Sequence, residues 1–156
     1  MLIAIYLNDH LAGATAGREL AKRAAASNRG TAYGPFLEEL ASQIDEDRDS
    51  LLTAMRALGI RVDPVKVAGG WAAEKLGRLK LNGRMRGYSP LSRVVELEAL
   101  ALGVHGKLAM WRSLKALEST LPLPASIDLR ELAARAEHQL EELETHRLGA
   151  VAEALP

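Results

Sequence analysis

The chain has 156 residues, which is the usual size of one domain and long enough to bury a core without disulfides. It contains no cysteine, which excludes a disulfide framework, a thiolate metal site and a cysteine nucleophile. Lys plus Arg and Asp plus Glu number 20 each, so the overall charge favours neither a nucleic-acid partner nor a membrane surface.

No stretch approaches the ~18 consecutive apolar residues that a membrane span needs. The apolar first residues are interrupted at positions 8–10 and no basic region precedes them, so we expect no signal peptide. Together with the lack of cysteine, this favours a cytoplasmic protein with one domain over residues 1–156 and no membrane partner.

Ala and Leu make up about a third of the residues, a bias toward strong helix formers that predicts an all-α fold. The first predicted helix covers about residues 2–28, where apolar and small residues recur at helical spacing. Its expected core stripe is Ile3, Tyr6, His10, Gly13, Gly17, Leu20, Ala21 and Ala24.

The second predicted helix covers about residues 35–58, with Pro35 at its start and Gly59 at its end. Its expected core stripe is Phe36, Leu40, Ile44, Asp47, Leu51, Met55 and Leu58. Its outer face is acidic, because residues 38–49 hold six carboxylates and one arginine.

Between residues 60 and 88, turn-forming pairs such as Asp63-Pro64 and Asn82-Gly83 flank one short predicted helix at about 64–81. A connection of ~30 residues is far longer than a turn between neighbouring helices. We therefore expect it to cross the length of the molecule.

The third long helix is predicted at about residues 91–118, apolar on almost every side, so we expect it to be the most enclosed. The fourth is predicted at about 128–152, where Asp128 and Glu131 have the spacing of a capping box. Its expected core stripe is Leu129, Leu132, Ala136, Leu140, Leu143, Arg147 and Ala150.

Two helices, a long crossover with a short helix and two more helices resemble the ferritin-like superfamily of antiparallel four-helix bundles. Members with a di-iron site carry Glu-x-x-His on two helices, and this chain has no such motif. In the second helix the corresponding window, residues 45–48, ends in Arg48 instead of a ligand. The resemblance therefore implies the bundle fold with a degenerate or absent di-iron site.

Polar residues interrupt the expected core stripes and form the candidate site. Burying such groups without partners is costly, so they should bind one another or a ligand. The candidate buried polar network is His10, Asp47, Arg48, Glu98, His105 and Arg147. In this interpretation His10 bonds to Asp47, and Arg147 or Arg48 neutralises Glu98.

The alternative is a metal site, because two imidazoles and two carboxylates are ligands that Fe, Mn and Zn accept. Its candidate ligands are His10, Asp47, Glu98 and His105. Glu98 and His105 are ~10.5 Å apart along a helix, too far for one ion. We therefore favour the network and expect no cofactor.

Two further patterns favour ordinary structural roles. His138, Glu142 and His146 recur every four residues, a spacing that could clamp zinc, but they miss the core stripe and predict a solvated face. Gly13 and Gly17 allow close helix packing. We find no pattern typical of a catalytic nucleophile.

The predicted crossover is basic, with seven cations and one carboxylate between residues 66 and 93. Its possible anion-binding residues are Lys75, Arg78, Lys80, Arg84 and Arg86. These could bind nucleic acid or another polyanion, or they could face the acidic second helix. The balanced total charge favours neutralisation within the chain.

The sequence thus favours a non-enzymatic bundle that acts through its surface or as a homo-oligomer. A metal-binding bundle with iron or oxygen chemistry and a polyanion-binding crossover are the alternatives.

Overall fold

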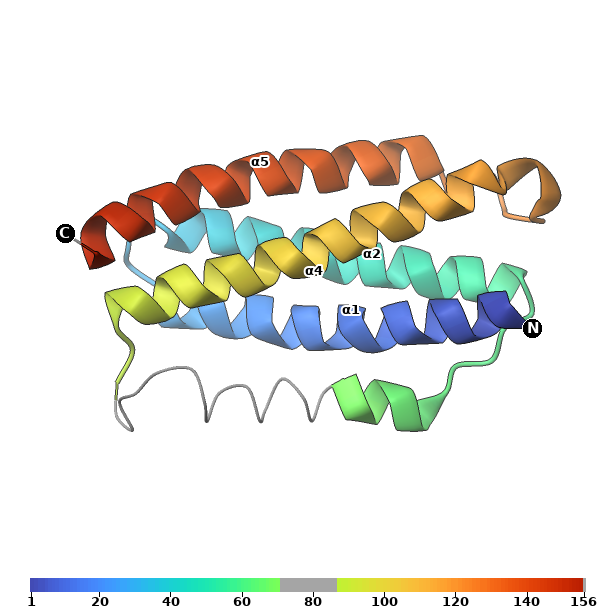
Figure 1. The fold of residues 1–156 in the computed structure, drawn as a ribbon, viewed down its shortest axis with the longest axis horizontal. Helices are drawn as coiled ribbons and strands as arrows, with labels where there is room; N and C mark the ends of the chain where they lie inside the picture. Colours follow the sequence, from blue (N-terminus) through green and yellow to red (C-terminus); the bar gives the residue numbers. More distant parts are fainter. Residues whose placement is uncertain (71–86, 156) are drawn as a thin grey trace.

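The computed structural model describes residues 1–70 and 87–155, and within these ranges every regular element is a helix, which confirms the all-α class. Four long helices lie lengthwise beside one another (Figure 1): α1 (Leu2–Ser27), α2 (Gly34–Ala57), α4 (Pro90–Ala116) and α5 (Leu129–Ala154). A short 3-10 helix, Glu118–Thr120, follows α4. Residues 64–70 are also helical. No helix in the described part of the chain is long and apolar enough to cross a membrane.

The observed helix ends lie close to the predicted ones, and local signals explain them. Ser89 caps α4, and its hydroxyl accepts a hydrogen bond from the Ser92 N–H at 3.2 Å. Asp128 caps α5 by accepting from the backbone N–H groups of Arg130 and Glu131. Gly59 follows α2 with φ +65°, a backbone conformation that glycine adopts without steric cost.

The helices α2 and α4 run in the same direction, which requires the intervening chain to return along the molecule (Figure 1). Contacts at one end agree with this direction. Asn28, in the turn between α1 and α2, bonds to Tyr88 and Arg93 at the start of α4. The α5 residue Glu153 accepts hydrogen bonds from Tyr33 and Arg93 at the same end.

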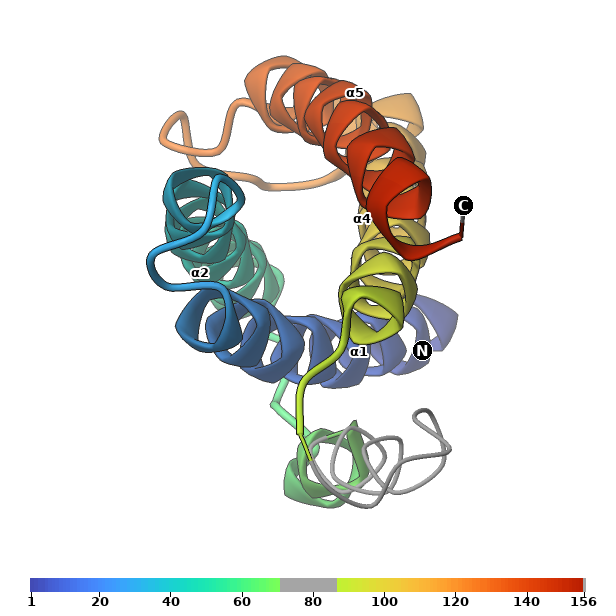
Figure 2. The same ribbon diagram turned by 90° about the vertical axis from the view of Figure 1, so that its left-hand side faces the viewer.

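The helix at residues 64–70 lies close against α1 (Figure 2). The side-chain amide of Asn8 donates to the Arg61 carbonyl at 3.0 Å, and its oxygen accepts from the Asp63 N–H at 2.7 Å. A side chain at Gly70 would overlap the backbone of Ala12, so only glycine fits there. The rest of the predicted helix 64–81 lies outside the described residues.

The core stripe of α2 agrees with the sequence, and so does that of α5 except at Arg147, which is only half-buried, whereas α1 and α4 differ from what was expected. In α1, Ala21 and Ala24 are buried as predicted, whereas Tyr6 and Gly13 are exposed and Leu7, Leu11 and Thr15 are buried in their place, so the first half of the expected stripe is wrong. In α4 one face is open to solvent, and Leu102 is 74% exposed. The helix is therefore not enclosed on every side. Leucines on more than one face of these helices make the buried face ambiguous in the sequence.

Candidate functional site

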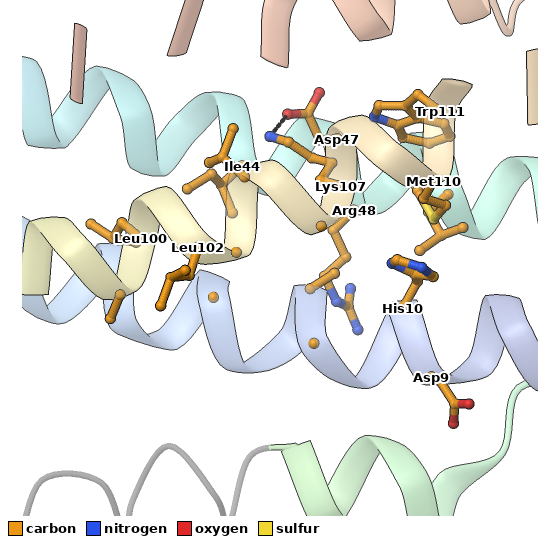
Figure 3. Close-up of a pocket in the computed structure, with 18 of the residues that line it drawn as sticks. Asp9, His10, Ile44, Asp47, Arg48, Leu100, Leu102, Lys107, Met110 and Trp111 are labelled. Atoms are coloured by element: carbon orange, nitrogen blue, oxygen red, sulfur yellow. Dashed lines mark hydrogen bonds and ion pairs between the residues drawn. The ribbon is translucent and has the colours of Figure 1, made fainter. Parts of the chain in front are cut away.

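A cavity of about 320 Å³ lies between α1, α2 and α4 (Figure 3). Its wall is largely apolar. The apolar side chains that line it include Ile44, Leu51, Leu100, Val104, Met110 and Trp111. Exposed lining residues, among them Gly13, Leu102 and Gly103, place its mouth on the face where α1 and α4 meet. Its volume falls at the lower end of the range for small-molecule sites, ~300–1,000 Å³.

Four helical glycines contribute to the wall: Gly13, Gly17, Gly103 and Gly106. A Cβ atom added at any of them would meet no atom of the described residues within 4 Å beyond its own local helix backbone. Glycine inside a helix costs ~0.5–1 kcal/mol relative to alanine. Packing against the described residues therefore does not require these glycines, and each leaves open space beside the cavity wall.

The carboxylate of Asp47, 2% exposed, stands at the junction of α2, α4 and α5. One oxygen accepts a hydrogen bond from Lys107, drawn in Figure 3, and the other accepts from Arg135. The buried amide of Gln139 also donates to Asp47, at 3.3 Å, and its oxygen accepts from Lys107 at 2.5 Å. Burial lowers the pKa of Lys107, and the charge of Asp47 acts against that shift. Lys107, Arg135 and Gln139 therefore satisfy the hydrogen-bonding capacity of the Asp47 carboxylate.

Arg48 lies one residue further along α2 and also lines the cavity. Its side chain extends toward α1 (Figure 3), where Nε donates to the Thr15 hydroxyl at 3.3 Å. Among the described residues no carboxylate forms an ion pair with it. Within residues 1–70 and 87–155 the guanidinium charge therefore has no anionic partner.

Trp111 is fully buried in the cavity wall, yet its indole Nε1 has no hydrogen-bond partner within residues 1–70 and 87–155. In Figure 3 this nitrogen faces the side on which Lys107 and Asp47 lie. A buried N–H without an acceptor costs ~1–3 kcal/mol. Among the described residues this donor is therefore unsatisfied, and its nitrogen has almost no surface that a group in the cavity could contact.

His10 lines the cavity from α1, in edge contact with the Tyr6 ring at 4.6 Å between ring centroids. Burial lowers its pKa, and the nearby charge of Asp9 partly opposes that shift. The polar partners of Asp47 are Lys107, Arg135 and Gln139, so the predicted bond from His10 to Asp47 is wrong.

The predicted burial of Glu98, His105 and Arg147 is also wrong. Arg147 does pair with Glu98, at 3.5 Å between Nη1 and Oε1, but the Glu98 side chain is 51% exposed. His105 is exposed as well. Glu98 and His105 lie on the open face of α4, so the four candidate metal ligands do not converge. In the described ranges no three His, Asp or Glu side chains are grouped to hold a metal ion.

Of the residues His138, Glu142 and His146 on α5, one histidine is exposed and the other is packed against α2. His138 is exposed and pairs with Glu142 at 3.3 Å, as expected for a solvated face. His146 stacks on Phe36 of α2 with ring centroids 3.8 Å apart. The three residues therefore do not form a zinc clamp.

Carboxylates on the acidic face of α2 form ion pairs with cations of other long helices. Asp45 pairs with Arg18 and Lys22 of α1, and Glu46 pairs with Arg135 of α5. At the two ends of the crossover, Lys66 pairs with Asp9 and Arg93 with Glu153. The candidate anion-binding residues Lys75, Arg78, Lys80, Arg84 and Arg86 lie outside the described residues.

Sequence reasoning missed Lys107, Trp111, Arg135 and Gln139. Gln139 falls between Ala136 and Leu143 on the buried stripe of α5, at spacings of three and four residues, so a search for polar residues on that stripe could have found it. The buried positions of Lys107 and Trp111 could not be identified from periodicity, because leucines occur on several faces of α4.

Comparison of the chain with protein-family models, curated proteins and solved structures finds no match. The assignment of a function therefore depends on the cavity itself.

Proposed function

We propose that this protein is a non-enzymatic helical bundle that binds a small, largely apolar molecule in the cavity between α1, α2 and α4. The glycines at positions 13, 17, 103 and 106 carry the proposal, because each leaves open space where alanine would stabilise its helix. A cytoplasmic protein with no resident metal is part of the same proposal.

The topology supports a ferritin-like bundle as the fold of this binding protein. The parallel direction of α2 and α4 and the helix at residues 64–70 are the features that such a bundle with a crossover would have (Figure 1). Where ferritin-like enzymes hold two metal ions, this chain has Asp47 bound by Lys107 and Arg135. We propose that an apolar cavity replaces the metal site.

The test is calorimetric titration with 1-octanol, a neutral apolar probe. The unmodified protein should bind it saturably, with a negative heat-capacity change. Gly106→Leu places a side chain in the open space and should abolish binding. Ala109→Leu is the matched control, because Ala109 is exposed on α4 and is not part of the wall. Absence of binding to the unmodified protein, or equal binding to Gly106→Leu, would refute the proposal.

An oligomer that closes the cavity mouth is the second candidate. Leu102 is 74% exposed beside Gly103, and such an apolar position beside a glycine suits a helix of a second copy. Light scattering coupled to gel filtration tests this candidate. A dimer that Leu102→Glu converts to a monomer would support it, and a monomer at all concentrations would exclude it.

A further inference from the structure

We propose that the molecule bound in the cavity carries one carboxylate on an apolar body, with the guanidinium of Arg48 as its counter-ion. This inference rests on the proposed function, since it names the chemical class of the ligand for the same cavity.

The charges in the cavity wall leave one cation unmatched. Asp9 pairs with Lys66 at 2.6 Å, and Asp47 is held by Lys107 and Arg135. Arg48 also lines the wall, and the described residues offer it a hydroxyl but no carboxylate. A ligand with one negative charge would balance it, since His10 is driven toward its neutral form by burial and adds no second cation.

The unmatched hydrogen-bonding groups are donors. The indole of Trp111 can only donate, and so can the guanidinium of Arg48. The Trp111 nitrogen is buried without an acceptor among the described side chains and lies on the side of Lys107 and Asp47 (Figure 3), whereas the Arg48 guanidinium lines the cavity itself. A carboxylate offers acceptors only, and it matches the guanidinium geometry better than a hydroxyl does.

The remaining wall and the volume define the body of the ligand. Leu100, Val104 and Met110 are apolar and offer no hydrogen bond from their side chains. At ~30 Å³ for each water-sized group, the cavity of about 320 Å³ holds about ten non-hydrogen atoms. Octanoate has this size, and 1-octanol is its neutral counterpart.

The experiment compares octanoate with 1-octanol by calorimetry on five proteins: the unmodified chain, Arg48→Met, Arg48→Lys, Arg56→Met and Gly106→Leu. Arg48→Met keeps much of the side-chain length and removes the charge, so octanoate should bind at least about tenfold more weakly while octanol changes less than about twofold. Arg56→Met removes an exposed α2 arginine outside the wall and should change neither. Arg48→Lys keeps a cation and should retain part of the octanoate affinity.

The outcomes separate this inference from the proposed function. If both probes bind, are blocked by Gly106→Leu and respond equally to Arg48→Met, the cavity binds apolar molecules and the carboxylate inference is overturned. If neither probe binds the unmodified protein, both proposals are overturned. If octanoate binds Gly106→Leu as well as the unmodified protein, it binds elsewhere and the inference fails. Circular dichroism melts establish that each variant is folded.

Discussion

Lys107 on α4 donates a hydrogen bond to Asp47 on α2, and both residues form part of the cavity wall. The same carboxylate is bound by Arg135 from α5, so one buried acid links three of the four long helices. Lys107 would lose its carboxylate partner if Asp47 were removed, whereas Arg135 would keep Glu46. The Asp47–Lys107 pair therefore contributes both to the stability of the fold and to the polarity of the cavity.

Replacement of Asp47 by alanine should lower the free energy of unfolding by ~3–5 kcal/mol, because it leaves the partly buried Lys107 without its acid and Arg135 with Glu46 alone. Urea unfolding at neutral pH measures this loss. Glu98→Ala is the control, since Glu98 is an exposed acid and its removal should leave the unfolding midpoint nearly unchanged. Equal losses in the two variants would contradict the assignment of Asp47 as the central buried acid.

Substitution of the wall glycines should stabilise the fold. Gly13→Ala and Gly106→Ala should each raise the free energy of unfolding by ~0.5–1 kcal/mol, because alanine favours the helix and its methyl group enters open space. Gly70→Ala should destabilise the protein, since its methyl group would overlap the Ala12 backbone. The denaturant midpoints of the three variants provide the measurement. A loss of stability in Gly13→Ala and Gly106→Ala would show that the space is filled.

The stability of the protein should fall as the pH is lowered through about 6.5, the ordinary pKa of histidine. Burial lowers the pKa of His10 in the folded chain, so between that lowered value and about 6.5 the unfolded chain binds more protons. Asp9 opposes the shift, and Arg48 and Lys107 are the cations of the same wall. Urea midpoints from pH 5 to 8 should show a weaker slope in His10→Gln. The control His105→Gln should keep the slope of the unmodified protein, and identical slopes in all three would contradict this account.

Protein purified without a histidine tag should contain less than one equivalent of iron, manganese or zinc per chain, as measured by elemental analysis. Excess chelator should leave the melting temperature unchanged, because no ion would stabilise the folded state by mass action. The reason is that Asp47 is already bound by Lys107, Arg135 and Gln139, while His105 faces solvent. One equivalent of metal, or a chelator-induced fall in melting temperature, would restore the metal-binding alternative.

The helices could be predicted from the sequence because their ends carry strong local signals. Ser89 and Asp128 cap α4 and α5, and Gly59 ends α2. The candidate site was predicted only in part, and Asp47 is the residue of that set that proved fully buried. Its position on a well-defined leucine stripe identified it.

The rest of the site depends on tertiary contacts. Glu98 and His105 share α4 with leucines on several faces, including the exposed Leu102, so periodicity alone could not identify the buried face. The cavity is lined by residues of α1, α2 and α4, including glycines of α1 and α4, and no single helix contains that information. That the buried Trp111 indole lacks an acceptor is apparent only in the folded structure of the described residues.

The central claim is that the cavity between α1, α2 and α4 holds a small apolar ligand. The most direct test is nuclear magnetic resonance of the methionine methyl groups. Met110 lines the cavity, whereas Met55 is fully buried in the core outside it, so the two methyl groups serve as reporter and internal control. Titration with octanoate should move the Met110 signal saturably, leave Met55 in place, and have no effect on Met110 in Gly106→Leu. A Met110 signal that stays fixed at saturating octanoate, or that moves no more than that of Met55, would contradict the account.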